Sequence, residues 1–514
     1  MDRRQKSKSK SKSKSKSARR ARRNSSVRRR SRAKPGSAHR STNAEQLRRL
    51  QEWLFPDHRI FASLKLHGNT TWLSRSLVCL ALCWAWSDAA TLTEAFTQAV
   101  GCCKLLAGDA ALSTYQGFMG AAVRWTDSLL RLLWPVLHQR LQEIGGEFWQ
   151  IGGWVPIAFD GSRSTAPRSQ ANESALCAPN YGHGQTAKYR KKKTKGLRRA
   201  KNQKHKPQPQ EPQAWITLMW HMGLRLPWMW RLGPSNSSER AHVMEMLDTG
   251  EFPKNTLFCG DAGFVGYPLW AHLAEAGQHF LVRVGANVSL LTQSPDCTLQ
   301  KNGRVLCWPQ AARRLKRPPL HLRLVQVRIG RTWMWMLTNV LSPSQLTLAQ
   351  IVRCYQQRWG IEVEFRGLKQ TLDRAKLRCR NDRRLLVELN WSIMAMTIAE
   401  LFALKEQLAT SVTTCVPLDL QIPKPDPQRR SLANTMRALR FCLRHLKEVP
   451  TRGHDLPSRL RLAVTDAYVR KGSKRARYHP PNPDKKPLGD PKLSQLSPQE
   501  KKQLTNFTNE NIAA

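Results

Sequence analysis

Four side chains with useful chemistry stand at fixed spacing in one short stretch: Tyr355, Arg358, Glu362 and Lys369. Each residue of an α-helix advances by about 100°, so on a helix the four would lie within roughly 60° of one another. A carboxylate beside two cations and a phenol suits a metal site that also holds phosphate. The alternative is a solvated helix face with intrahelical ion pairs. Spacing alone leaves both readings open.

Two aspartates each follow a short apolar run. Asp160 closes the run at residues 154–159, and Asp261 closes the run at residues 255–260. Apolar runs of this length predict buried strands that deliver a carboxylate to the strand end. The alternative is an ordinary turn residue at each place.

The predicted order is strand-Asp, two strands, helix, strand-Asp, helix, strand, insertion and helix-Glu. It puts three carboxylates on two strand ends and one helix, namely Asp160, Asp261 and Glu362. Adjacent strand ends and a helix that crosses them can converge into one site. No histidine or cysteine cluster accompanies the carboxylates, and oxygen ligands alone select Mg²⁺ or Mn²⁺. Two such ions can activate a water molecule and stabilise the leaving oxygen of a phosphodiester displacement.

The composition predicts a polyanionic partner. The 514-residue chain has 85 Lys and Arg against 36 Asp and Glu, a formal net charge of +49. Such an excess repels itself, and nucleic acid is the usual partner that relieves it. A membrane fits less well, because no basic amphipathic helix stands out and the apolar runs 77–86 and 391–404 are too short to span a bilayer. The N-terminus also lacks the apolar segment of a secretory signal.

The twelve cysteines indicate a reducing compartment. They are scattered, with one adjacent pair at Cys102 and Cys103, and none forms a CxxC motif. They show neither metal-ligand spacing nor a disulfide framework, so we interpret them as reduced core thiols in a cytosol.

Two regions precede the predicted strands. Residues 1–43 are a Lys/Ser and Arg repeat, which predicts a disordered basic tail with sequence-independent affinity for phosphates. Residues 44–150 have a helical pattern. They form either a DNA-binding domain or a helical scaffold for the domain that follows.

Residues 151–405 alternate predicted strands and helices, which indicates an α/β catalytic domain. Residues 163–213 form an inserted basic loop able to lie along a DNA backbone. Residues from about 285 to 331 form a small β-rich insertion. A long helix that begins at Thr347 carries the third carboxylate, and an amphipathic helix over residues 385–404 follows.

The last region, residues 406–514, is rich in proline and charge. One helix is predicted at residues 430–447. Beyond Lys471 the composition predicts disorder.

The spacing Y-x2-R-x3-E-x6-K that starts at Tyr355 resembles the Y-R-E-K signature of DDE transposases of bacterial insertion sequences, of the insertion-sequence-4 type. Asp160 in Phe-Asp-Gly-Ser and Asp261 in Gly-Asp-Ala-Gly-Phe resemble the first and second catalytic aspartates of that family. The Leu-Thr-Asn strand at residues 337–339 is also similar. The resemblance covers roughly residues 150–405.

This resemblance implies an RNase H-like catalytic core with a β insertion before the last catalytic helix, preceded by the helical N-terminal domain. It implies that Asp160, Asp261 and Glu362 hold two divalent ions, Mg²⁺ or Mn²⁺. Water would attack the phosphodiester at the element end, and the freed 3′-hydroxyl would then attack target DNA or the opposite strand.

The resemblance also implies the DNA contacts. Tyr355, Arg358 and Lys369 would hold the phosphates near the cut, in agreement with their donor types. In relatives of this type, a tryptophan on the strand before the signature helix stacks on an unstacked base. The matching position here is Met334, with Trp333 and Trp335 on either side. Neighbouring strand residues point to opposite faces, so which tryptophan serves, if either does, stays open.

The implied partners are terminal inverted repeats and target DNA, bound by a homodimer at the nucleoid in a bacterial cytoplasm. The long basic loop directly after Asp160 departs from the family pattern. Two alternatives remain. One is a non-catalytic basic DNA-binding protein derived from a transposase, and the other is a metal-dependent nuclease that cuts without strand transfer.

Overall fold

The structure is a computed structural model that places most of the chain from Ser41 onward. The predicted basic tail up to residue 40 and most of the predicted basic loop, residues 177–210, lie outside the described residues. The described residues are 41–64, 66, 70, 72–108, 112–176, 211–293, 299, 303–330, 332–409, 426–465 and 488–513.

Helices form the region before the sheet. They are α1 (Asn43–Leu54), the short 3-10 helix η1 (His58–Ser63), α2 (Ser74–Trp86), α3 (Leu92–Ala107) and α4 (Tyr115–Gly145). Threonine side chains cap the N-termini of α1, α3 and α4 by accepting a backbone N–H of the first turn. Because α2 is apolar on nearly every face, it is buried between α3, α4 and later helices.

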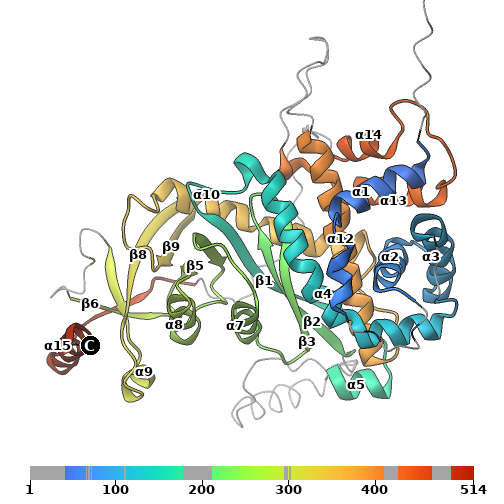
Figure 1. Cartoon of the computed structure of the whole chain (residues 1–514). Coiled ribbons are helices and arrows are strands. Elements are labelled where there is room, and N and C mark those ends of the chain that lie inside the picture. The colour runs from blue at the N-terminus through green and yellow to red at the C-terminus, as the bar shows by residue number, and fades with distance from the viewer. Residues whose placement is uncertain are drawn as a thin grey trace, which may run out of the picture. The chain divides into compact units, whose positions relative to one another are not determined.

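All strands of the described residues belong to one sheet, in the order β10-β6-β7-β8-β9-β5-β4-β1-β2-β3 (Figure 1). β1, β4 and β5 are parallel, and β2 and β9 run antiparallel to them. β4 is buried on both faces, as central parallel strands are. The fold is therefore mixed α/β around one large sheet. The strands are β1 (Val155–Thr165), β2 (Gln213–His221), β3 (Leu226–Pro234), β4 (Thr256–Gly260), β5 (His279–Val284), β6 (Ser289–Thr292), β7 (Arg304–Cys307), β8 (Leu320–Ile329), β9 (Thr332–Thr338) and β10 (Lys492–Gln495).

β1 extends further than the sequence predicted. Its pairing with β4 stops at Ala158 and Cys259, but its pairing with β2 continues to Thr165. Asp160 therefore lies inside the strand, and its predicted place at a strand end is wrong. The reason is the antiparallel partner β2, which keeps the rest of β1 extended.

The strands between β5 and β9 extend the main sheet and do not form a sheet of their own. β8 pairs with the whole of β9, from Arg323 to Ile329, and β7 and β6 follow outward. The short helix α9 (Gln310–Arg314) connects β7 to β8 in sequence. The region predicted as a β-rich insertion, about 285–331, thus shares its hydrogen-bonded sheet with the strands of the site.

The C-terminal segment is ordered where the sequence predicted disorder. β10 pairs in parallel with β6, and α15 (Pro498–Ala513) follows. The disorder predicted beyond Lys471 is therefore wrong for residues 488–513, while residues 466–487 lie outside the described part. β10 is ordered because its backbone groups satisfy the open edge of β6, an effect that hydropathy does not register.

α12 (Asp382–Ala409) joins the regions of the chain. It packs against α2, α4 and β3, and against α13 (Leu432–Arg444) and α14 (Leu456–Arg461) (Figure 1). The predicted amphipathic helix at residues 385–404 is wrong in its polarity, because almost every face of α12 is buried. By length and hydropathy α12 could cross a membrane, but 94% of its apolar window is buried inside the protein.

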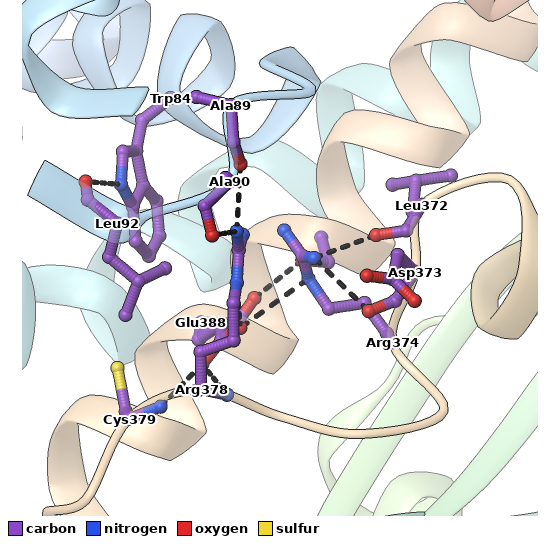
Figure 2. Close-up of polar contacts among 11 residues, drawn as sticks. Trp84, Ala89, Ala90, Leu92, Leu372, Asp373, Arg374, Arg378, Cys379 and Glu388 are labelled. Atoms are coloured by element: carbon purple, nitrogen blue, oxygen red, sulfur yellow. Dashed lines mark hydrogen bonds and ion pairs between the residues drawn. The ribbon is translucent and has the colours of Figure 1, made fainter. Parts of the chain in front are cut away.

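Figure 2 shows a buried carboxylate that ties α12 to its surroundings. One oxygen of Glu388 accepts the N–H groups of Arg378 and Cys379, each at 3.0 Å. The other oxygen lies 3.7 Å from Arg374 Nε and 3.5 Å from Arg378 Nε. Arg378 also donates to the Ala89 carbonyl oxygen at 3.0 Å, in the turn between α2 and α3. One carboxylate thus connects the N-terminal helices with the segment that leads from the site into α12.

The cysteines of the described residues all carry free thiols, and all except Cys102 are buried. This part of the fold therefore contains no disulfide, and its thiols pack in the core.

Candidate active site

The pairing of two strands brings the predicted aspartates together. β1 and β4 run parallel, and their last paired residues are Ala158 and Cys259. Asp160 and Asp261 each follow two residues after these paired positions, at the same edge of the sheet. Adjacent strands lie about 4.8 Å apart, so these two residues are neighbours.

The Asp160 carboxyl group has few partners that stabilise its negative charge. Its side chain is 20% exposed, and its Oδ1 accepts the N–H of Gly161 at 2.8 Å. Burial raises the pKa of Asp160 to about 6. The adjacent N–H and Arg358 oppose this shift, whereas the negative charges of Asp261 and Glu362 add to it. A carboxylate in this state gains from a bound cation.

Asp261 begins a tight loop directly after β4. Its Oδ1 accepts the N–H of Gly263 at 2.7 Å, as in an Asx turn. Asn287, after β5, donates from Nδ2 to the Ala262 carbonyl oxygen at 3.1 Å. These two hydrogen bonds hold the second aspartate in place from within the loop and from the neighbouring strand.

The helix that carries the third carboxylate is interrupted. α10 (Leu348–Arg358) ends at Trp359, and α11 (Gly360–Gln370) begins directly after it, so the prediction of one continuous helix is wrong. The first glycine of α11 packs so tightly on the ring of Trp220 that a Cβ atom would overlap with the ring. Glu362 N donates to the Trp359 carbonyl oxygen at 3.2 Å, so the chain keeps a helical turn through the break.

Arg358 lies between the first and third carboxylates. Its Nη1 is 3.7 Å from Asp160 Oδ2, and its Nη2 is 4.0 Å from Glu362 Oε1. The Arg358 side chain is 4% exposed, whereas that of Glu362 is 45% exposed. Among the described residues, neither Nε nor Nη1 of Arg358 has a hydrogen-bond partner. Arg358 therefore links the two carboxylates through charge.

The four signature residues do not share one exposed helix face. Tyr355 and Arg358 are buried in the core, while Glu362 and part of Lys369 reach the surface. α10 packs against β4 and β8, and α11 packs against β1. These strands cover the helix face that would otherwise meet solvent, so two of the four signature residues lie in the core.

Lys369 connects α11 to β1. Its Nζ donates to Ser162 Oγ at 2.7 Å, and burial lowers the pKa of Lys369. A pocket of about 420 Å³ opens beside this contact. It brings two carboxylates and two cationic side chains to one surface, which suits a phosphate group with bound cations. The lining residues are Asp160, Gly161, Ser162, Glu362, Phe365, Arg366, Lys369 and Gln370.

The two candidate tryptophans lie on β9. Trp335 pairs with Val284 at the end of β5, which places the start of β9 at the same sheet edge as Asp261. Trp333 is 60% exposed, whereas Trp335 donates from Nε1 to Asp490 Oδ1 at 2.8 Å. Residues two apart on a strand point to the same face, so both rings stand on one side of the sheet.

A fourth carboxylate belongs to this neighbourhood, and sequence reasoning missed it. Glu239 is the first residue of α7 (Glu239–Thr249), and its carboxylate packs over Gly161 so closely that a Cβ atom there would overlap with it. Burial raises the pKa of Glu239 to about 7, and the negative charges of Asp160 and Asp261 add to the shift. An acidic residue in a first helical turn is ordinary, because it complements the helix dipole, so the sequence carried no special signal.

The side chains that could hold a metal here are hard oxygen donors. In the described part of the chain, no three His, Cys, Asp or Glu side chains are already gathered at metal-binding distance. Arg358 occupies the space between Asp160 and Glu362. The carboxylate donor set fits Mg²⁺ or Mn²⁺ better than softer metals.

Comparisons with known proteins find similarity to transposases. The chain is similar to piggyBac transposase in a cryo-EM structure of its synaptic complex with hairpin DNA, at 14% sequence identity and a TM-score of 0.35, over 83% of this chain and 86% of that chain. Among curated protein sequences, no significant match is found. Residues 156–398 match the family described as "Transposase DDE domain", and this segment contains all three predicted carboxylates. This segment of the chain is therefore similar to transposase DDE domains.

Proposed function

We propose that this chain is a metal-dependent DNA transposase that cleaves phosphodiester bonds at the ends of a mobile element and transfers the freed strands. One observation carries the proposal. The strand register sets Asp160 beside Asp261, and Arg358 links Glu362 to the same spot, inside a segment that matches a transposase DDE domain. Each of these carboxylates alone would be ordinary.

We assign the catalytic segment to an RNase H-like core of the insertion-sequence-4 type. The central strand order β3-β2-β1-β4-β5, in which β2 runs against the others, supports this assignment. So does the position of Glu362 on a helix that packs against β1.

Asp160, Asp261 and Glu362 would hold two divalent ions, Mg²⁺ or Mn²⁺. Such ions, when bound, activate water and stabilise the leaving oxygen of a phosphodiester displacement. The chain itself gathers the carboxylates and limits their repulsion with Arg358, which lies within 4.0 Å of two of them. The first displacement uses water at the element end, and the second uses the freed 3′-hydroxyl.

The DNA contacts are assigned as follows. Lys369 lines the open pocket and binds phosphate directly. Arg358 sits 5.4 Å from the centre of the Tyr355 ring, so Tyr355 supports the guanidinium that faces the cut. Trp333, the more exposed of the two candidates, stacks on an unstacked base, and Trp335 borders the same surface.

Double-stranded DNA is the proposed partner, as terminal inverted repeats and as target. The net charge of +49 supports it, because phosphate contacts supply most non-specific DNA affinity. We further propose a homodimer in the DNA complex and a location at the nucleoid of a bacterial cytoplasm.

The test uses purified full-length protein and a labelled duplex carrying the DNA that flanks its coding region. Wild type is compared in Mg²⁺ and in Mn²⁺ with Asp160→Asn, Asp261→Asn and Glu362→Gln. Each variant should lose cleavage by about a thousandfold or more while keeping its DNA affinity. Glu245→Gln serves as the control, because Glu245 is half exposed on α7 and pairs with Arg231 at 2.8 Å.

The products separate the alternatives. Cleavage at a defined end followed by a joined product supports a transposase. Cleavage without joining would indicate a nuclease. DNA binding without cleavage in either metal would overturn the catalytic proposal and leave a non-catalytic DNA-binding protein.

A further inference from the structure

Glu239 approaches the site from the face of β1 opposite to α11. Successive residues of a strand point to opposite faces, so Ser162, which binds Lys369 of α11, shares a face with Asp160. Gly161 belongs to the other face, and there the Glu239 carboxylate packs against it. The N-terminus of α7 and the helix of the third carboxylate therefore flank Asp160 from two sides.

The helix α7 is fixed on this second face. Thr217, paired with Gly161 in the sheet, shares a hydrogen bond of 2.9 Å with Nδ1 of His242 in α7. Arg240 donates from Nη1 to the Val265 carbonyl oxygen at 2.7 Å, in the loop that follows Asp261. The first turn of α7 is thus attached both to β2, the strand paired with β1, and to the loop of the second aspartate.

At Asp160, β1 is still paired with β2 but no longer with β4. The pairing of β1 with β4 ends before Asp160 and Asp261, so no backbone ladder separates these aspartates from the Glu239 side. The negative charges of Asp160 and Asp261 both act on Glu239. The three carboxylates therefore share one electrostatic neighbourhood.

The positive charges near Glu239 are engaged elsewhere. The guanidinium of Arg163 lies 4.2 Å from the centre of the Trp215 ring, and that of Arg240 binds the Val265 carbonyl oxygen. Both act on Glu239 only through space. On the α11 side, by contrast, Arg358 lies directly between Asp160 and Glu362. Among the described residues, the Glu239 side is thus the one where the carboxylates have no directly paired cation.

We propose that Glu239 is a fourth metal ligand, which with Asp160 and Asp261 forms one of two cation positions, while Asp160 and Glu362 form the other. This inference rests on the proposed function and extends it by one residue. It also explains Gly161, because a side chain at that position would push the carboxylate away from the site.

The test measures Mn²⁺ binding to the full-length protein by electron paramagnetic resonance, with no DNA present and hence no activity required. Wild type should bind two Mn²⁺ ions. Glu239→Gln should weaken one of them by about tenfold or more, and Glu245→Gln on the same helix should bind as wild type does. Gly161→Ala should reproduce the loss, because the added methyl group displaces the carboxylate. Combining it with Glu239→Gln should bring no further loss.

Thermal unfolding without metal separates a ligand from a structural residue. If Glu239 is a metal ligand, the metal-free Glu239→Gln variant should melt at or above the wild-type temperature. Mn²⁺ should then raise the melting temperature of the variant less than that of wild type. A lower melting temperature with unchanged Mn²⁺ binding would overturn the inference. If Asp160→Asn still abolished binding in that case, the proposed function would stand without Glu239. If wild type bound no Mn²⁺ with or without DNA, the proposed function would fall as well.

Discussion

Asp160 and Glu388 are both carboxylates beside arginines, yet they differ in burial, in hydrogen bonds and in the number of nearby arginines. Glu388 is fully enclosed, accepts two backbone N–H groups and lies within 3.7 Å of Arg374 and Arg378. Asp160 keeps 20% of its side chain exposed, accepts one N–H and has one arginine at 3.7 Å, which it shares with Glu362.

The difference separates a carboxylate that stabilises the fold from one that we propose binds a metal ion. At Glu388 two positive charges face one negative charge, and the cluster closes the junction between α12 and the N-terminal helices. At Asp160 several carboxylates face the single guanidinium of Arg358. Excess negative charge beside a pocket destabilises the metal-free protein and favours the binding of a cation.

The largest effect is expected from Glu388→Ala. It leaves the guanidinium groups of Arg374 and Arg378 buried without their carboxylate, so the free energy of unfolding should fall by about 3–5 kcal/mol. Urea unfolding followed by tryptophan fluorescence measures this change. Glu245→Ala removes a half-exposed ion pair and should change stability by no more than about 1 kcal/mol. Equal losses in the two variants would erase the distinction drawn between the two carboxylates.

The next effect concerns pH. The pKa of Asp160 is about 6 in the folded protein, against an ordinary value of 3.8. As the pH rises, the unfolded chain therefore releases this proton at a lower pH than the folded protein does. This contribution is complete below about pH 3.8 and is lost as the pH rises through about 6. Metal-free wild type should therefore lose up to about 3 kcal/mol relative to Asp160→Asn across that window. Urea unfolding at stepped pH gives the difference, and a flat difference curve would contradict the raised pKa.

The smallest effect compares the two arginines. Arg358→Ala should reduce the slope of log DNA affinity against log salt by about one, because it removes a positive charge beside the proposed phosphate site. Arg378→Ala should leave that slope unchanged and lower the free energy of unfolding by about 1–3 kcal/mol. Fluorescence anisotropy at several salt concentrations tests both. A slope unaffected by Arg358→Ala would mean that this guanidinium serves the carboxylates alone.

Local patterns made much of the site predictable. β5 and β8 begin and end where their apolar runs do, at His279–Val284 and Leu320–Ile329. The same kind of run marked Asp160 and Asp261, and parallel pairing of β1 with β4 explains why the two aspartates meet. Short-range periodicity is sufficient for such features because each strand carries its own signal.

Contacts between distant parts of the chain could not be predicted in this way. A helical wheel gives the angle between Tyr355 and Arg358 but not the strands that bury them. β2 prolongs β1 past Asp160, and β10 joins β6 through backbone pairing between distant parts of the chain. Glu239 looked like a first-turn acidic residue until its helix was placed over Gly161.

The central place of α12 has a consequence for how the protein is made. α4 ends at Gly145 and α12 begins at Asp382, so at 5–20 residues per second the ribosome needs roughly 10–50 s to pass from one to the other. During that time the N-terminal helices lack their packing partner α12. In the complete fold, Trp391 of α12 donates from Nε1 to Oγ1 of Thr126 in α4 at 2.9 Å. In the nascent chain, the apolar side chains of α2 and α4 that α12 later covers are therefore open to chaperones. When α12 emerges, these side chains offer its long apolar surface a partner within the same chain, in competition with any nearby bilayer.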